Sequence, residues 1–223
     1  MSEWILFSVG LPVILRYQGH TYDLDMIDGD YITRVCKETG TFYEAPLLMY
    51  LQGKQITGTY VDVGAHVGNH TVFFGCECPS LDVVAIEASP RNARLLARNV
   101  LANGLDKHVK IVSEPAGASG QKIDVIQDGE GNTGMDRVQL GESRAVVTLD
   151  EIVPVAAVIK IDVEGFEPHV LGGATRLLRT GPLLIIEAVD RAAFDVQHDI
   201  LSSYGYRPVE VFNATPTVIW EVK

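Results

Sequence analysis

The sequence predicts an α/β protein with a doubly wound, mostly parallel sheet. Residues 155–161 and 183–186 are almost continuously apolar, which is typical of parallel strands buried on both faces. Segments with helical apolar spacing alternate with such runs, and this alternation indicates a sheet covered by helices on both sides. The 223 residues fit one domain. We therefore expect a single domain over residues 1–223, with an N-terminal extension at 1–58 and a core at 59–223.

The N-terminal extension carries two local signals. Residues 13–17 and 21–25 alternate between apolar and polar side chains around Gln18-Gly19-His20, which predicts a β-hairpin. Residues 44–51 have the apolar spacing of a short helix.

The core begins with a strand at residues 59–63, a glycine turn at 64–68 and a helix that ends near Cys76. A strand at 81–86 leads into Ser89-Pro90, which favours a helix start, and Asn103-Gly104 ends that helix. The further expected elements are strands at 109–112, 155–161 and 183–186, a hairpin-like excursion of 121–127 and 144–149 around a glycine-rich loop, helices at 168–178 and 191–204, and an antiparallel pair at 207–212 and 217–222.

Charge and cysteine content limit the expected partners. Eighteen basic and 29 acidic residues give a formal charge of −11, which repels phosphate backbones and anionic lipid, so we expect no nucleic-acid and no membrane partner. Cys36, Cys76 and Cys78 show no disulfide framework, and no signal peptide or apolar membrane span is evident. We expect a cytoplasmic protein and leave a homo-oligomer open.

The turn after the first core strand is the first candidate for ligand binding, because ligands of such folds bind at the carboxyl ends of strands. Its two glycines allow close backbone approach and expose N–H groups at a helix start. The turn lacks the Gly-x-Gly-x-x-Gly diphosphate pattern, and a carboxylate suits an amino-acid tail better than a diphosphate. The candidate cofactor-binding residues here are Asp62, Gly64, Ala65, His66, Gly68 and Asn69.

Glu87 ends the second core strand and can accept both hydroxyls of a nucleoside ribose. The alternative is an exposed carboxylate stabilised by the following helix start. We add Ala88 and Ala116 to the cofactor-binding set.

Further charges follow the two apolar strands. Lys160, Asp162 and Glu164 come at the end of one, and Glu187 ends the other. Charges in such places are either mutually paired or functional, and Lys160 paired with an acid is the simpler reading.

These motifs together resemble the FkbM-type S-adenosylmethionine-dependent methyltransferases, over about residues 42–187. The resemblance is carried by Tyr60-Val-Asp-Val-Gly-Ala-His-Val-Gly68, Ile86-Glu-Ala-Ser-Pro90, Gly131-Asn-Thr-Gly134, Thr148-Leu-Asp-Glu151, Ile159-Lys-Ile-Asp-Val-Glu-Gly-Phe-Glu167, Leu171-Gly-Gly-Ala174 and Glu187. It implies the class I methyltransferase (Rossmann-like) fold, a seven-stranded sheet with an antiparallel C-terminal strand. It also implies S-adenosylmethionine as methyl donor and O-methylation of a sugar, glycan or secondary-metabolite hydroxyl.

The sequence departs from the family pattern at His66, where a smaller polar residue is expected, and at Phe166, where a more polar one is expected. His66, His70 and His169 are too scattered for a metal set, and capping or packing roles suit them better.

Methyl transfer to a hydroxyl requires removal of its proton. We expect Asp162 to be this base and to lie beside the cofactor as well, with Glu164 as the substitute catalytic residue. Alternatively, Asp162 and Glu187 hold a divalent cation such as Mg²⁺ that orients a small-molecule or glycan acceptor. Residues 128–136 are expected to close over the site when acceptor binds. The rival functions are a nucleotide-dependent oxidoreductase and a non-catalytic binding module.

Overall fold

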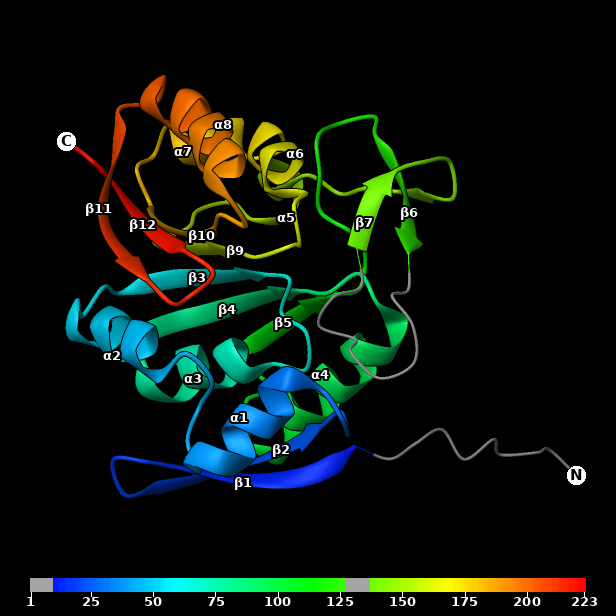
Figure 1. The fold of residues 1–223 in the computed structure, drawn as a ribbon, viewed down its shortest axis with the longest axis vertical. Helices are drawn as coiled ribbons and strands as arrows, with labels where there is room; N and C mark the ends of the chain where they lie inside the picture. Colours follow the sequence, from blue (N-terminus) through cyan, green and yellow to red (C-terminus); the bar gives the residue numbers. More distant parts are fainter. Residues whose placement is uncertain (1–9, 127–136) are drawn as a thin grey trace, which may run out of the picture.

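A computed structural model describes residues 10–126 and 137–223, and its centre is a seven-stranded sheet (Figure 1). The strand order is β11-β12-β10-β9-β3-β4-β5. In chain order the strands are β3 (Gly58–Val63), β4 (Ser80–Ile86), β5 (Val109–Val112), β9 (Val158–Ile161), β10 (Leu183–Glu187), β11 (Tyr206–Phe212) and β12 (Thr217–Val222).

The sheet is mostly parallel. The pairs β3–β4, β4–β5, β3–β9 and β9–β10 are parallel, whereas β12 runs antiparallel to both β10 and β11. This confirms the predicted sheet, including its antiparallel C-terminal strand. Asp62 on β3 is in register with Lys160 on β9, so the ends of these two central strands bring their charges together.

Helices cover both faces of the sheet (Figure 1). One face carries α2 (Ala45–Gly53), α3 (Asn69–Glu77) and α4 (Pro90–Ala102), and the other carries α5 (Leu149–Ile152), α6 (Glu167–Gly172), α7 (Thr175–Leu178) and α8 (Arg191–Ser202). Each face has its own apolar core, with Phe73 and Phe74 fully buried in the first and Trp220 in the second. The strands between them bury both of their faces, as their continuous apolar sequence requires.

The N-terminal extension packs beside α3 and α4 (Figure 1). The predicted hairpin is β1 (Leu11–Tyr17) with β2 (His20–Met26), and the predicted helix is α2. The sequence interpretation missed α1 (Tyr31–Thr39), although its signals are present. Asp30 accepts hydrogen bonds from the Ile32 and Thr33 amides at the helix start, and Gly40 ends the helix with φ 69°.

The expected hairpin at 121–127 and 144–149 is instead part of a three-stranded sheet. Its order is β7-β6-β8, so that β6 (Lys122–Ile126) lies between β7 (Arg137–Leu140) and the short β8 (Arg144–Ala145). The loop 128–136, expected to act as a lid, lies within 127–136, outside the described residues.

The expected helix at 168–178 is two helices, α6 and α7, separated at Gly173. A Cβ on Gly173 would lie 2.0 Å from the carbonyl oxygen of Gly117, so the backbone of this turn packs directly on a neighbouring loop. In the described ranges, 10–126 and 137–223, no helix is long and apolar enough to cross a membrane.

Candidate active site

The turn between β3 and α3 has an uncommon backbone. Gly64, His66 and Gly68 have φ values of 78°, 51° and 96°, in the left-handed region that favours glycine. A Cβ on Gly64 would lie 1.8 Å from the Asp162 carbonyl oxygen, so the turn lies directly against the end of β9. Gly64 therefore allows close packing against β9, and both glycines allow the left-handed backbone of the turn. The turn lies at the strand ends, where ligands of such folds bind.

Asp62, Thr71 and Lys160 form a buried polar network under this turn. Thr71 Oγ1 donates to Asp62 Oδ2 at 2.6 Å, and Lys160 Nζ lies 3.3 Å from Asp62 Oδ1. Lys160 also donates to the Gly64 carbonyl oxygen at 3.0 Å. Burial alone lowers the pKa of Lys160, but the charges of Asp62 and Asp162 outweigh it and raise the pKa. Lys160 is thus a fixed cation that joins two strands and the glycine turn.

Glu87 lies buried at the end of β4, with its carboxylate held by two backbone amides. His66 N donates to Oε2 at 2.8 Å and Ser89 N donates to Oε1 at 2.7 Å. A carboxylate offers about four lone-pair sites, so each oxygen keeps acceptor capacity for another donor. Burial raises the pKa of Glu87 to about 7 despite these two hydrogen bonds. The remaining acceptor positions of the Glu87 carboxylate suit two hydroxyl donors.

Ala88 directly follows Glu87 beyond the end of β4, and Ala116 lies beyond the end of β5. Arg144 donates to the Ala88 carbonyl oxygen at 2.5 Å and to the Ser113 carbonyl oxygen at 2.8 Å. Ala116 forms a parallel bridge with Val147. The sequence interpretation did not single out Arg144, because nothing in the local pattern tells which carbonyls a lone arginine reaches.

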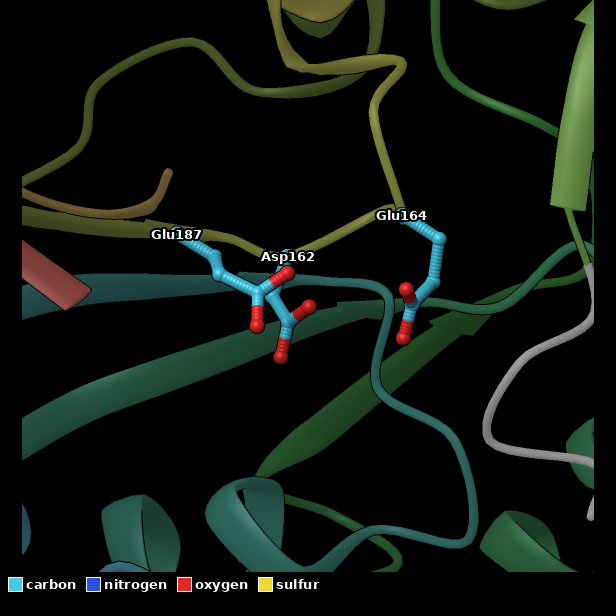
Figure 2. A group of neighbouring side chains, drawn as sticks. All are labelled: Asp162, Glu164 and Glu187. Atoms are coloured by element: carbon cyan, nitrogen blue, oxygen red, sulfur yellow. The ribbon is translucent and has the colours of Figure 1, made fainter. Parts of the chain in front are cut away.

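Asp162, Glu164 and Glu187, here called the acidic triad, gather where β9 and β10 end (Figure 2). One carboxylate oxygen from each lies within 4.8 Å of the other two. Figure 2 shows the three side chains directed to the same side of the β9 end. The Asp162 side chain is 33% exposed, so a bound molecule can reach it, and Lys160 Nζ lies 3.5 Å from Asp162 Oδ2.

Burial, and next the charge of Asp162, raise the pKa of Glu187 to about 9. Two close carboxylates in a partly buried place cannot both ionise easily, so one of them holds a proton near neutral pH. The triad therefore combines a partly exposed carboxylate that has a cationic partner with a neighbouring carboxyl group whose raised pKa favours its protonated form.

Glu167 fixes the segment that carries Glu164 of the triad, a role that the sequence interpretation did not assign. Its buried side chain accepts hydrogen bonds from the amides of Val163 and Gly165 at 3.0 and 3.1 Å, through the same oxygen. In this segment Glu164 and Gly165 have φ values of 54° and 98°, and the two hydrogen bonds to Glu167 support this left-handed turn.

Asn69 serves the N-terminal extension rather than presenting its side chain to a ligand. Its side chain accepts from Tyr43 N at 3.0 Å and donates to the Tyr43 carbonyl oxygen at 3.2 Å. Burial, and next the charge of Glu44, raise the pKa of Tyr43, and the charges of Asp162 and Glu187 add to this rise. The extension thus contacts the start of α3 through Tyr43, which the sequence did not indicate.

His70 and His169 contact different neighbours. His70 Nε2 lies 2.9 Å from Glu44 Oε2, His169 Nδ1 lies 2.8 Å from Gln121 Nε2, and the His169 ring stacks on Phe166 at 4.2 Å. Burial lowers the pKa of His66. The predicted packing roles hold for His70 and His169. Cys36, Cys76 and Cys78 are free thiols.

The strand order, the glycine turn after β3 and the buried acid that ends β4 define a class I methyltransferase fold. A family model described as "Methyltransferase FkbM domain" matches residues 62–208. This chain belongs to the FkbM methyltransferase domain family, as the sequence motifs indicated. The family is a class I family, and membership implies use of S-adenosylmethionine.

Three individual proteins illustrate the similarity. The ribosomal RNA small subunit methyltransferase G of Prochlorococcus marinus (strain NATL1A) is 26% identical over 98 residues, which are 43% of this chain and 38% of that relative. The structure of an FkbM methyltransferase from Methylobacillus flagellatus KT superposes with a TM-score of 0.55 and 22% identity, over 73% of this chain and 43% of that one. A precorrin-6y C5,15-methyltransferase from Geobacter metallireducens GS-15 gives a TM-score of 0.54 and 15% identity, over 80% and 86%. This chain thus spans less than half of the first two relatives, and the solved structures support the fold alone.

The expectation of no nucleic-acid partner is wrong. It rested on the net charge of −11, yet the matched Prochlorococcus relative is by name a ribosomal RNA methyltransferase. Net charge is a property of the whole surface, whereas nucleic acid contacts one face, so acidity overall does not exclude such a partner.

Proposed function

We propose that this chain transfers a methyl group from S-adenosylmethionine to a hydroxyl oxygen of a sugar, glycan or secondary metabolite. The observation that carries the proposal is the acidic triad beside the glycine turn, with the partly exposed Asp162 carboxylate at its centre. Such a carboxylate can take a proton from an acceptor hydroxyl, which a bare fold without acids at this strand end could not do.

The residues around the turn fit the methyl donor. Glu87 has acceptor capacity for two ribose hydroxyls, and it is already oriented by the His66 and Ser89 amides. Ala88 and Ala116 would hold the adenine end of the cofactor, and Gly64, Ala65 and Gly68 would hold its methionine tail. The bound cofactor supplies an electrophilic methyl group on a sulfonium, and the chain supplies alignment and proton removal.

Asp162 acts as the general base in this proposal. Lys160, 3.5 Å away, provides a counter-charge, while the neutral form of Glu187 avoids repulsion with Asp162 and can donate a hydrogen bond to the acceptor. A carboxylate oxygen of Glu164 lies within 4.8 Å of an oxygen of Asp162 and of Glu187, and in this proposal Glu164 orients a second acceptor hydroxyl.

A second arrangement uses the same carboxylates as ligands. Oxygen-only donor sets suit Mg²⁺, and the spacing of the triad allows Asp162, Glu187 and Glu164 to hold one cation. A cation there would orient vicinal hydroxyls and lower the pKa of the one that reacts. Asp162 would then act as a ligand rather than as the base.

RNA is the second candidate for the acceptor. Helix α4 begins directly after residues 87–89, here called the Glu87 turn. Its exposed face carries Arg91, Arg94 and Arg98 at helical spacing. Rows of arginines of this kind contact phosphates in complexes with nucleic acids. Within this row, Arg98 is paired with Asp25 at 2.5 Å.

The experiment is a methyl-transfer screen with labelled S-adenosylmethionine over glycans, polyketide and peptide metabolites, and unmodified ribosomal and transfer RNA. The proposal expects label in a hydroxylated small acceptor, with a mass increase of one methyl group for hydrogen. Transfer to RNA alone would replace it with the second candidate. Absence of transfer to every acceptor class, with bound cofactor demonstrated, would count against hydroxyl methylation.

A further inference from the structure

The guanidinium of Arg144 joins the segments that follow β4 and β5. Nη1 donates to the Ala88 carbonyl oxygen at 2.5 Å, and Nη2 donates to the Ser113 carbonyl oxygen at 2.8 Å. Ala88 directly follows Glu87 after β4, and Ser113 directly follows Val112, the last residue of β5. A guanidinium is planar and its donors form a rigid fork, so two such bonds fix the separation of the two segments.

The chain that carries Arg144 is itself held in place. Val147 N donates to the Pro115 carbonyl oxygen at 2.9 Å, and Gly117 N donates to the Val147 carbonyl oxygen at 3.0 Å. On its other side Arg144 pairs with Ile123 of β6. Arg144 is half-buried. Its side chain therefore starts from an ordered backbone on both sides, which keeps the entropy cost of its two hydrogen bonds low.

The two joined segments are those that flank the adenosine half of the cofactor in the proposed function. One carries Glu87, which would hold the ribose, and the other leads to Ala116, beside the adenine ring. Glu87 N donates to the Val112 carbonyl oxygen at 3.0 Å, so the backbones of β4 and β5 are hydrogen-bonded up to Glu87. The guanidinium of Arg144 links the two segments one residue beyond this bond.

We propose that Arg144 is a positioning residue for the adenosine half of S-adenosylmethionine, and that it holds the Glu87 turn and the 113–116 segment at the separation which ribose and adenine require. The inference rests on the proposed function. It makes the small β7-β6-β8 sheet a working part of the cofactor site, because β8 carries Arg144. Loss of the guanidinium leaves two carbonyl groups without these donors and lets the two segments move apart, so one ligand no longer meets both at once.

The test compares two arginines that both bind backbone carbonyls. Arg176 donates to the carbonyl oxygens of Pro154, Val153 and Asp150 at 2.6, 2.6 and 2.9 Å, and none of these residues adjoins the Glu87 turn. Arg144→Met, Arg176→Met and the parent chain are each titrated by calorimetry with S-adenosylhomocysteine and with adenosine, and each is melted thermally.

Arg144→Met should weaken both ligands by the same factor, about tenfold or more, which corresponds to about 1.4 kcal/mol. Arg176→Met should lower the melting temperature and leave both affinities unchanged. In Arg144→Ala, millimolar ethylguanidinium should recover part of the lost affinity, whereas ethylammonium should not, because one ammonium cannot reproduce the fork. If Arg144→Met does not fold, Arg144→Lys is used, which keeps a donor for one carbonyl.

Parent affinity in the Arg144 variant, or equal losses in the Arg144 and Arg176 variants, would overturn the inference while leaving the proposed function intact. A parent chain that binds neither ligand would instead overturn the proposed function, and the inference with it.

Discussion

Lys160 Nζ lies 3.3 Å from Asp62 Oδ1, and both side chains are buried where the two central strands β3 and β9 are in register. The pair is the structural centre of the site, because Lys160 also contacts Gly64 and Asp162. Removing one partner of a buried ion pair leaves an uncompensated charge, which typically destabilises a protein by about 3–5 kcal/mol. We expect Lys160→Met to lower the free energy of unfolding by about this amount, as measured by urea denaturation.

The matched control is Lys122→Met. Lys122 pairs with Glu142 at 3.4 Å on the surface, where both side chains are more than half exposed, so its loss should cost under about 1 kcal/mol. A cost for Lys160→Met as small as that of the control would mean that Asp62 needs no counter-charge.

Gly64 provides a second test of the turn. Gly64→Ala places a Cβ 1.8 Å from the Asp162 carbonyl oxygen in a residue with φ 78°, so it should destabilise the fold by more than the roughly 1–3 kcal/mol of a strained backbone alone, and weaken cofactor binding. Gly104→Ala is the control, because Gly104 has φ 70° but open space around its Cβ position. Equal costs in both variants, measured by thermal unfolding, would show that close packing against Asp162 is not what requires glycine at position 64.

Glu87 makes cofactor affinity depend on pH. Burial raises its pKa to about 7 in the free protein, and ribose hydroxyls donate to the ionised form. Protons therefore compete with the ligand below the pKa, so the affinity for S-adenosylhomocysteine should fall up to about tenfold per pH unit below about 7, and level off above it. Calorimetry between about pH 5.5 and 8.5 measures this. Glu87→Gln should bind the ligand more weakly and remove the pH dependence. An affinity of the parent chain that is equal at the lowest and the highest pH would contradict the role of Glu87 in ribose binding.

Much of this site is local in sequence, and those parts could be predicted. Asp62 lies one residue before the end of β3, and Glu87 and Asp162 directly follow β4 and β9. Parallel strands with a clear apolar pattern bring such ends together at one edge of the sheet. The glycine turn was recognisable for the same reason.

The parts that could not be predicted depend on distant segments. The clamp of Asn69 on Tyr43, the two carbonyls bound by Arg144 and the break at Gly173 each join residues far apart in the chain. The helix α1 is different, since all of its signals are local: Asp30 at the start, Gly40 at the end, and between them an amphipathic segment that buries Thr33 and Cys36. The nucleic-acid exclusion failed because it inferred a local property from the total charge.

Asp162→Asn tests the base. The swap keeps the shape and removes the charge, so turnover of an identified acceptor should fall by about 10²-fold or more, while the affinity for S-adenosylhomocysteine stays within a few-fold. Part of the activity should return at high pH, where the acceptor ionises unaided. Full turnover in this variant would reduce Asp162 to a partner of Lys160 and move attention to Glu164 and Glu187.

The metal arrangement predicts a different response of the same variant. If the triad holds a cation, chelator should silence the parent chain, and added Mg²⁺ or Mn²⁺ should partly restore Asp162→Asn. Parent turnover that is unchanged by chelator excludes a required cation, and the base assignment then stands alone.

Binding of S-adenosylmethionine at the glycine turn and Glu87 is measured by calorimetry with S-adenosylmethionine, S-adenosylhomocysteine and NADH. We expect micromolar binding of the first two, about −7 to −8 kcal/mol, similar weakening of both by Glu87→Ala, and no binding of NADH. No heat and no thermal shift with either sulfur ligand, together with binding of NADH, would contradict this assignment and favour a nucleotide-dependent oxidoreductase.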